Sequence, residues 1–228
     1  MREVDLSARF GVSRGVIREC VRALEERDLV VVKHGWGATV RSPQEWNVLA
    51  SDVLGALLTV GHDQAVLREY LECRRCLEVQ AAGLAALRAT RDDLRRLSDA
   101  YRAMQEAAEK VTEVDITPIR GVISAAEEAF HRADIGFHQA VVDAAHNRAL
   151  LHILRPLDQA LYLIRLPLAR PHAREERALP EHERILTAIL SQDGDAAQEA
   201  MATHLTTVSG YLDELLRPSG RRRVSRTI

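Results

Sequence analysis

Four polar side chains in the second half of the chain have residue types that bind divalent metal ions: Asp134, His138, His182 and His204. Asp134 and His138 are four residues apart in an apolar stretch, so a helix would place both on one side. The other two histidines belong to two later helical stretches, and helical bundles build metal sites from facing helices. The residues therefore predict one site, although a buried histidine hydrogen-bonded to a nearby carboxylate is the alternative.

A second set of residues suits contact with nucleic acid. Arg14, Arg18 and Arg22 follow one another at intervals of four, so they share one side of a helix, while Val16, Ile17 and Val21 take the other side. An arginine row opposite a buried stripe fits a helix in the major groove, with its first residues at base edges and later ones at phosphates. Three glutamates on the same segment leave an ordinary surface helix as the alternative.

The composition limits the classes of protein that these residues can serve. Hydrophobic residues make up 46% of 228 residues but aromatic residues only 4%, which favours helices packed through Leu, Ala, Val and Ile. The net charge of −2 means that DNA contact requires a local basic cluster. We expect a cytoplasmic protein without membrane contact, since no apolar run reaches the roughly 20 residues of a membrane span and no signal peptide is present.

Three cysteines indicate a reducing compartment, because their number is odd. Cys73 and Cys76 lie inside a helical pattern that has no second cysteine pair and no loop residues around it. A redox or zinc pair is the alternative, but we expect both to be thiols of the hydrophobic core.

The first 41 residues predict the elements of a winged helix-turn-helix. A short helix at Val4–Phe10 ends at Gly11, and Ser13 caps a second helix that reaches Arg27. The apolar face of this second helix is expected to comprise Val16, Ile17, Cys20, Val21 and Leu24. Two β-rich segments at 29–32 and 38–40, joined by a glycine-containing turn, predict a hairpin.

The remaining chain predicts a mainly α protein. A linker at 42–45 precedes an all-α antiparallel bundle of six to seven helices at 46–217, and a basic tail at 218–228 is expected to be solvated. The expected helices cover residues 46–60, 63–89, 91–111, 122–145, 147–166, 178–192 and 195–217.

The amino-terminal motifs resemble the GntR family of transcription regulators. The resemblance is carried by the run Phe10–Glu19, by Leu24-Glu25 with Asp28-Leu29-Val30, and by Gly35-Trp36-Gly37. It implies that Ser13, Arg14 and Arg18 contact operator DNA, while His34 and Gly35 in the wing enter the adjacent minor groove. Arg22 joins this set through its spacing.

Members of that family carry a further helix and a Pro-Gly turn ahead of this region, and nothing precedes Met1 in this sequence. Val4 also stands where many relatives place an arginine that contacts DNA. We therefore expect the winged helix-turn-helix at 1–41 to lack its first helix and to expose apolar surface. A misassigned start codon is the explanation that we favour over a real truncation.

The helical half resembles the FCD effector-binding domain of the FadR-like subfamily. The matching runs are Asp134–His138, Glu181–Leu186 and Ala200–Leu205. In metal-containing members, the residues that match Asp134, His138, His182 and His204 bind one divalent ion. Three imidazoles and one carboxylate suit Zn²⁺ first, with Ni²⁺ or Mn²⁺ as alternatives.

Such a ligand set leaves coordination positions open, so a metal-dependent hydrolase is the alternative function. Hydrolysis also needs a general base beside the metal-bound water, and no HExxH or comparable motif provides one. We therefore expect no enzyme. The open positions are expected to take the carboxylate of a small organic acid.

The segment Glu72–Glu78 resembles the E-x-R-x-x-L-E stretch of the same domain, in which the arginine that matches Arg74 faces the effector cavity. Arginine recognises carboxylates in a bidentate manner. Pairing of Arg74 with Glu72 or Glu78 within the helix is the alternative. The resemblance implies a homodimeric repressor that binds double-stranded operator DNA and is released by its effector.

Overall fold

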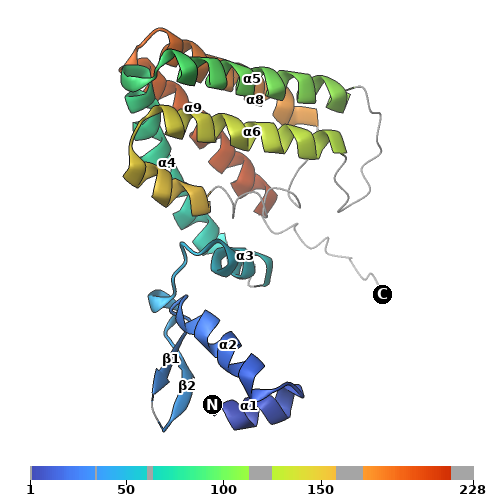
Figure 1. Ribbon diagram of the computed structural model, residues 1–228. Helices are drawn as coiled ribbons and strands as arrows, with labels where there is room; N and C mark the ends of the chain where they lie inside the picture. Colours follow the sequence, from blue (N-terminus) through green and yellow to red (C-terminus); the bar gives the residue numbers. More distant parts are fainter. Residues whose placement is uncertain (1, 34, 61–63, 113–124, 158–171, 217–228) are drawn as a thin grey trace, which may run out of the picture. The chain divides into compact units, whose positions relative to one another are not determined.

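Residues 1–57 and 58–228 form two units, in a computed structural model that describes residues 2–33, 35–60, 64–112, 125–157 and 172–216. The first unit begins with α1 (Glu3–Phe10) and α2 (Arg14–Glu25). Strands β1 (Val30–Lys33) and β2 (Gly37–Val40) follow, then the short helix η1 (Pro43–Glu45). The boundary between the units falls within α3 (Ser51–Val60). This order is that of the expected winged helix-turn-helix (Figure 1).

Local signals explain why these elements start and stop where they do. Gly11 adopts a φ of +66°, a left-handed conformation that glycine tolerates well, and its N–H bonds to the carbonyl of Ser7 at the end of α1. The Ser13 hydroxyl accepts a hydrogen bond from the N–H of Val16 and so caps α2. The strands form an antiparallel hairpin in which Val30 pairs with Val40.

The apolar face that we expected on α2 is only partly buried. Ile17 is enclosed and Val21 is half-buried, whereas Val16, Leu24 and Cys20 are exposed. The expectation that Val16 belongs to the core was therefore wrong, whereas the placement of Ile17 in the core is confirmed. A unit of this size has too little interior to enclose every apolar side chain of a two-turn stripe.

The second unit is a helical bundle, which confirms the expected fold class. Its helices are α4 (Gln64–Arg88), α5 (Arg91–Thr112), α6 (Ala125–Ala144), α8 (His172–Leu190) and α9 (Gly194–Leu216), with a further helical segment at 148–157. Helix α5 packs along α6, and α9 packs against both α4 and α8 (Figure 1). The carboxyl-terminal part of the helix expected at 147–166 and the basic tail lie outside the described residues.

Two helices begin at residues well away from the expected starts, while the other described boundaries differ by at most three residues. Helix α3 begins at Ser51 rather than at 46, because η1 and a short turn precede it. Helix α8 begins at His172, six residues before the expected start, and contains Pro180. Proline removes one backbone hydrogen bond and its ring crowds the carbonyl of the preceding turn, so this helix depends on the packing of its other residues.

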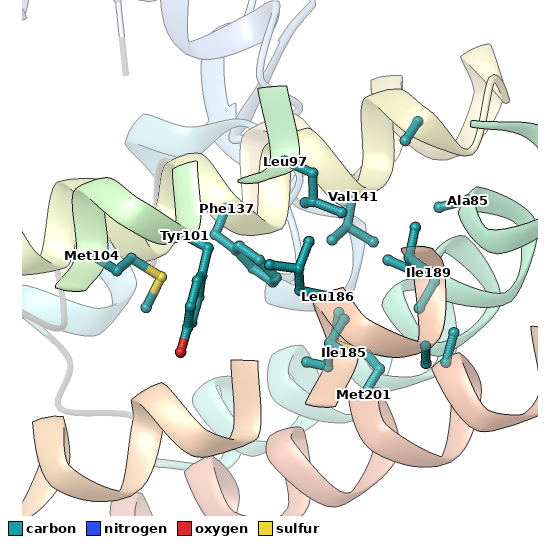
Figure 2. Packing of buried hydrophobic residues seen from close by; sticks show 14 of the residues in the cluster. Ala85, Leu97, Tyr101, Met104, Phe137, Val141, Ile185, Leu186, Ile189 and Met201 are labelled. Atoms are coloured by element: carbon teal, nitrogen blue, oxygen red, sulfur yellow. The ribbon is translucent and has the colours of Figure 1, made fainter. Parts of the chain in front are cut away.

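Aliphatic side chains make up most of the core of the helical unit, as the composition predicted. Figure 2 shows Leu97 and Met104 of α5 near Phe137 and Val141 of α6, with Ile185 and Ile189 of α8 and Met201 of α9 on the other side. Each of these side chains is at most 1% exposed. This packing holds α6, α8 and α9 in fixed register, and those three helices carry the four predicted metal ligands.

The prediction that Cys73 and Cys76 belong to the core was wrong, because both thiols are exposed. The buried stripe of α4 passes instead through Leu71, Arg74 and Glu78. Burial of an ion pair at these positions turns the two cysteines outward.

No helix within the described residues is both long and apolar enough to cross a membrane.

Candidate metal centre

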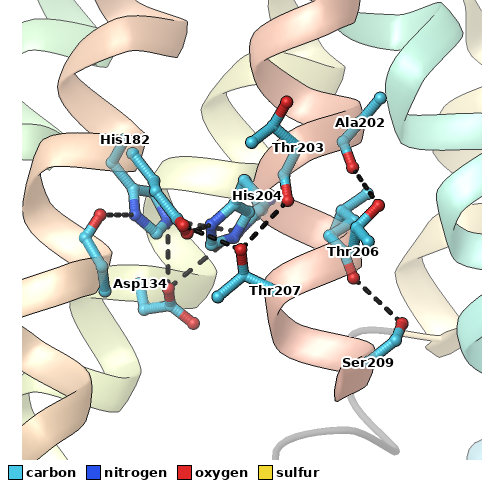
Figure 3. A network of polar contacts seen from close by, with 12 residues as sticks. Asp134, His182, Ala202, Thr203, His204, Thr206, Thr207 and Ser209 are labelled. Atoms are coloured by element: carbon cyan, nitrogen blue, oxygen red, sulfur yellow. Dashed lines mark hydrogen bonds and ion pairs between the residues drawn. The ribbon is translucent and has the colours of Figure 1, made fainter. Parts of the chain in front are cut away.

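The structure brings together all four residues that the sequence singled out for metal binding. Asp134 and His138 lie on successive turns of α6. Figure 3 shows Asp134 with His182 of α8 and His204 of α9. One potential ligand atom from each lies within 4.8 Å of the other three. None of the four residues is more than 3% exposed, so their polar atoms have been removed from water together.

The atoms that converge are an oxygen and imidazole Nε2 atoms. Oδ1 of Asp134 lies 3.1 Å from Nε2 of His182 and 3.9 Å from Nε2 of His138. The two Nε2 atoms lie 3.3 Å apart. The Nε2 atom of His204 is buried and has no hydrogen-bond partner among the described residues. Phe137 closes one side, with its ring centroid 4.9 Å from that of His182.

The opposite nitrogen of each histidine faces an acceptor. Nδ1 of His182 lies 2.7 Å from the carbonyl oxygen of Ala178. A carbonyl can only accept, so Nδ1 donates, and in the neutral imidazole with this tautomer Nε2 carries the lone pair. Nδ1 of His204 lies 2.9 Å from a carboxylate oxygen of Glu181, whose other oxygen accepts a hydrogen bond from the hydroxyl of Thr207.

His138 has the corresponding contact with Glu78 on α4. Its Nδ1 lies 2.6 Å from Oε2 of Glu78, although the N–H is not aligned well enough for a regular hydrogen bond. The other oxygen of Glu78 pairs with Nε of Arg74, and all three side chains are at most 2% exposed. Burial alone would raise the pKa of Glu78, but the positive charge of Arg74 and the contact with His138 lower it to about 2. Glu78 is therefore a permanent anion beside His138.

Burial keeps two of the imidazoles uncharged. It lowers the pKa of His138, against the opposing charge of Glu78. It also lowers the pKa of His204 well below its usual value, and the neighbouring His182 and His138 lower it further. A neutral imidazole with its proton on Nδ1 presents a lone pair on Nε2. In that tautomer His138 and His204 direct two lone pairs toward the carboxylate of Asp134, which is unfavourable without a cation between them.

This donor set fits a divalent metal ion. Three imidazole nitrogens and one carboxylate oxygen are a ligand combination that Zn²⁺ uses in proteins, and Ni²⁺ and Mn²⁺ accept similar sets. The contacts at Nδ1 match the pattern in which metal-binding histidines donate their second N–H to a carboxylate or a backbone carbonyl.

Arg74 pairs with Glu78 inside α4, which was one of the two alternatives for this residue. Glu72 is exposed and does not share this buried position. Contact of Arg74 with an effector stays a prediction. Glu78 and Glu181 were not predicted as partners of the histidines, and the only sequence signal for Glu181 is its place directly before His182.

The residues proposed to contact DNA lie in the first unit. Ser13 caps α2, and the side chains of Arg14, Arg18 and Arg22 are exposed along that helix. Nε of Arg18 lies 3.7 Å from a carboxylate oxygen of Glu3. Such exposed pairs contribute little and exchange readily for other anions.

Gly35 occupies the turn between the strands with a φ of +78°, and His34 lies outside the described residues. A positive φ at this turn explains the glycine without reference to DNA.

Comparison with known proteins links both units to one family. Residues 1–40 match the family model of bacterial regulatory proteins of the gntR family, and residues 69–207 match the FCD domain. The chain is 33% identical to the HTH-type transcriptional regulator LutR of Bacillus subtilis, over 92% of this chain and 90% of the relative. It is 31% identical to the galactonate operon transcriptional repressor of Escherichia coli, over 93% and 86%.

Among solved structures, a Streptococcus agalactiae protein described as GntR aligns with a TM-score of 0.54 and 26% sequence identity. The alignment covers 91% of this chain and 87% of that protein.

Proposed function

This chain belongs to the GntR family of DNA-binding transcriptional regulators and carries an FCD domain, and on that premise we propose that it is a metal-dependent, carboxylate-responsive repressor. The observation that carries the metal and effector part of this proposal is the buried convergence of Asp134, His138, His182 and His204. One relative is named as a repressor of a galactonate operon, which supports repression as the mode of action.

The four residues would hold one divalent ion, with Zn²⁺ as the first candidate and Ni²⁺ or Mn²⁺ as alternatives. When bound, such an ion supplies a fixed positive charge with positions open to a carboxylate oxygen. Arg74 is the second cation of this region and is proposed to attract the same ligand. Because Glu78 already pairs with Arg74, an effector that reaches the guanidinium has to share it with this carboxylate.

Helix α2 is proposed to lie in the major groove of operator DNA. Arg14 and Arg18 stand near its amino-terminal end, where side chains reach base edges, and Arg22 lies one turn further, where phosphates are closer. Ser13 and the wing residues His34 and Gly35 complete the proposed interface. A homodimer, acting in the cytoplasm on a two-fold symmetric operator, would present two such helices to two half-sites.

The effector can change DNA affinity only through a difference in its affinity for two arrangements of the protein. We propose that a small organic acid at the metal favours the arrangement that binds DNA less well. The hydrolase alternative is not favoured, because the acidic residues Glu78 and Glu181 contact Nδ1 atoms of histidines instead of facing the ligand position.

Metal analysis of the purified chain tests this proposal. We expect about one divalent ion per chain, and we expect a His138→Ala/His204→Ala double variant to lose it. His152 is exposed, so His152→Ala is a matched control that should retain the ion. Retention of metal by the double variant would contradict the four-ligand assignment. Turnover of simple esters or amides that His182→Ala abolishes would favour the hydrolase.

A further inference from the structure

The two carboxylates that contact histidine Nδ1 atoms, Glu78 and Glu181, lie on different helices from the histidines that they contact. Glu78 on α4 lies beside His138 on α6, and Glu181 on α8 lies beside His204 on α9. Neither glutamate belongs to the cluster of four potential ligands. Their position therefore differs from that of a ligand, because each contacts the cluster through the Nδ1 atom of one imidazole.

We propose that Glu78 and Glu181 are positioning residues that set the affinity of the metal centre by holding His138 and His204 in the Nδ1–H tautomer. This inference rests on the proposed metal site. A carboxylate at Nδ1 fixes the proton there, orients the ring and leaves Nε2 as a more basic donor. His182 needs no carboxylate, because the backbone carbonyl of Ala178 performs the same task.

Each glutamate is itself held by a second contact. Glu78 pairs with the guanidinium of Arg74, and Glu181 accepts a hydrogen bond of 2.9 Å from the hydroxyl of Thr207. The carboxylate of Glu181, with both oxygens hydrogen-bonded, has few alternative rotamers, and the ion pair with Arg74 restricts Glu78. Each therefore restricts its imidazole more firmly than a free side chain would. Arg74 and Thr207 thereby extend the support of the centre onto α4 and α9.

The surroundings of the two glutamates differ, and this difference makes the proposal testable. Glu78 is 1% exposed inside the bundle, whereas Glu181 is partly exposed at a groove of about 620 Å³ between α8 and α9. Substitution of Glu78 leaves Arg74 buried without its carboxylate and endangers folding. Glu181 can be changed with much less damage because water reaches its surroundings.

The test is a zinc titration of the full chain in competition with a chromophoric chelator. We expect Glu78→Gln and Glu181→Gln to bind Zn²⁺ about 10- to 100-fold more weakly than the parent chain. Glu72→Gln on α4 and Glu183→Gln on α8 replace exposed glutamates of the same helices, and both controls should match the parent.

A second measurement separates positioning from a general effect on folding. Nitrogen-15 spectra of the metal-free protein should show His204 as the Nδ1–H tautomer in the parent and a shift toward Nε2–H in Glu181→Leu. If Glu78→Gln fails to fold, the Glu181 variants still decide the question. Zinc affinity within twofold of the parent in Glu181→Gln, with an unchanged His204 tautomer in Glu181→Leu, would overturn the proposal. A parent chain that binds no zinc would overturn the metal site itself.

Discussion

Nε2 of His182 lies 3.1 Å from Oδ1 of Asp134, so α8 and α6 place two potential metal ligands at one buried point. The Nδ1 atom of the same imidazole is held by the carbonyl of Ala178. Nδ1 of His182 therefore donates to a carbonyl, and its Nε2 is the atom that faces Asp134. A cation at this point would be coordinated by both atoms.

Metal removal should destabilise the helical unit. An ion that binds only the folded state raises the free energy of unfolding by about 2.7 kcal/mol when its free concentration is 100 times its Kd. We expect the parent chain to show a higher Tm in zinc than in a chelator. Differential scanning fluorimetry should show this shift in His152→Ala and not in His138→Ala/His204→Ala. Equal shifts in both variants would place the bound ion elsewhere.

Loss of Phe137 should weaken both the fold and the metal centre. Its side chain is fully buried, packs against Tyr101 and lies against His182 and His138. We expect Phe137→Ala to lower the free energy of unfolding by about 3–5 kcal/mol, because it creates a cavity in the core. Urea unfolding measures this effect.

Leu190→Ala provides the matched control for this change, since Leu190 is 47% exposed on α8. We expect this substitution to change the free energy of unfolding by no more than about 0.5 kcal/mol. A small effect of Phe137→Ala, comparable with that of the control, would contradict the packing described for the centre.

The free energy of unfolding of the helical unit should depend on pH through Asp93, at the amino-terminal end of α5. Burial would raise the pKa of this carboxyl group, but hydrogen bonds from Thr90 and contacts with His146 and Arg96 hold it far below its usual range. A depressed folded-state pKa stabilises the protein above the unfolded-state value of about 3.9. This stabilisation is lost progressively as the pH falls below that value.

Asp93→Asn should therefore lower the free energy of unfolding by about 1 kcal/mol at pH 7, as expected for loss of a helix cap. The difference in free energy of unfolding between the variant and the parent chain should become smaller as the pH falls toward about 2. Asp99→Asn removes an exposed carboxylate of the same helix and should have little effect. A difference that is constant with pH would show that the charge of Asp93 does not contribute.

Arg14→Ala and Arg18→Ala should weaken binding to a fragment of the gene's own promoter. A lost base contact costs about 1–3 kcal/mol and relaxes specificity at one position. Arg22→Ala should instead weaken binding to all DNA sequences, as expected for a phosphate contact. The slope of the logarithm of the binding constant against the logarithm of the salt concentration should fall in magnitude by about 1. Fluorescence anisotropy at several salt concentrations distinguishes these effects. Unchanged affinity in Arg14→Ala and Arg18→Ala, as in the control Arg95→Ala on α5, would contradict the placement of α2.

The convergence of Asp134, His138, His182 and His204 could be predicted from sequence because each belongs to a helix whose apolar stripe fixes its inward direction. The helical spacing of Asp134 and His138 was sufficient to place both on one face. The contacts of Glu78 and Glu181 could not be predicted, because they join different helices and depend on tertiary register.

The hydrophobic pattern predicted the wrong buried residues where polar and apolar side chains lie along the same face of a helix. In α4 the buried positions hold Arg74 and Glu78, whose ion pair compensates the burial of both charges, and the two cysteines face outward. A pattern that ranks residues by hydropathy alone favours the cysteines. The contact of His146 with Asp93 was missed for a similar reason, because 53 residues separate the two in sequence.

The most direct test is a titration of promoter DNA binding with a carboxylate, carried out on zinc-loaded and on chelator-treated protein. Acetate and galactonate serve as probes, and chloride at equal ionic strength serves as the control. We predict that at least one carboxylate weakens DNA binding by zinc-loaded protein and has no such effect on the His138→Ala/His204→Ala variant. An identical response of both proteins, or no response of either, would contradict control of DNA binding through the Asp134, His138, His182 and His204 centre.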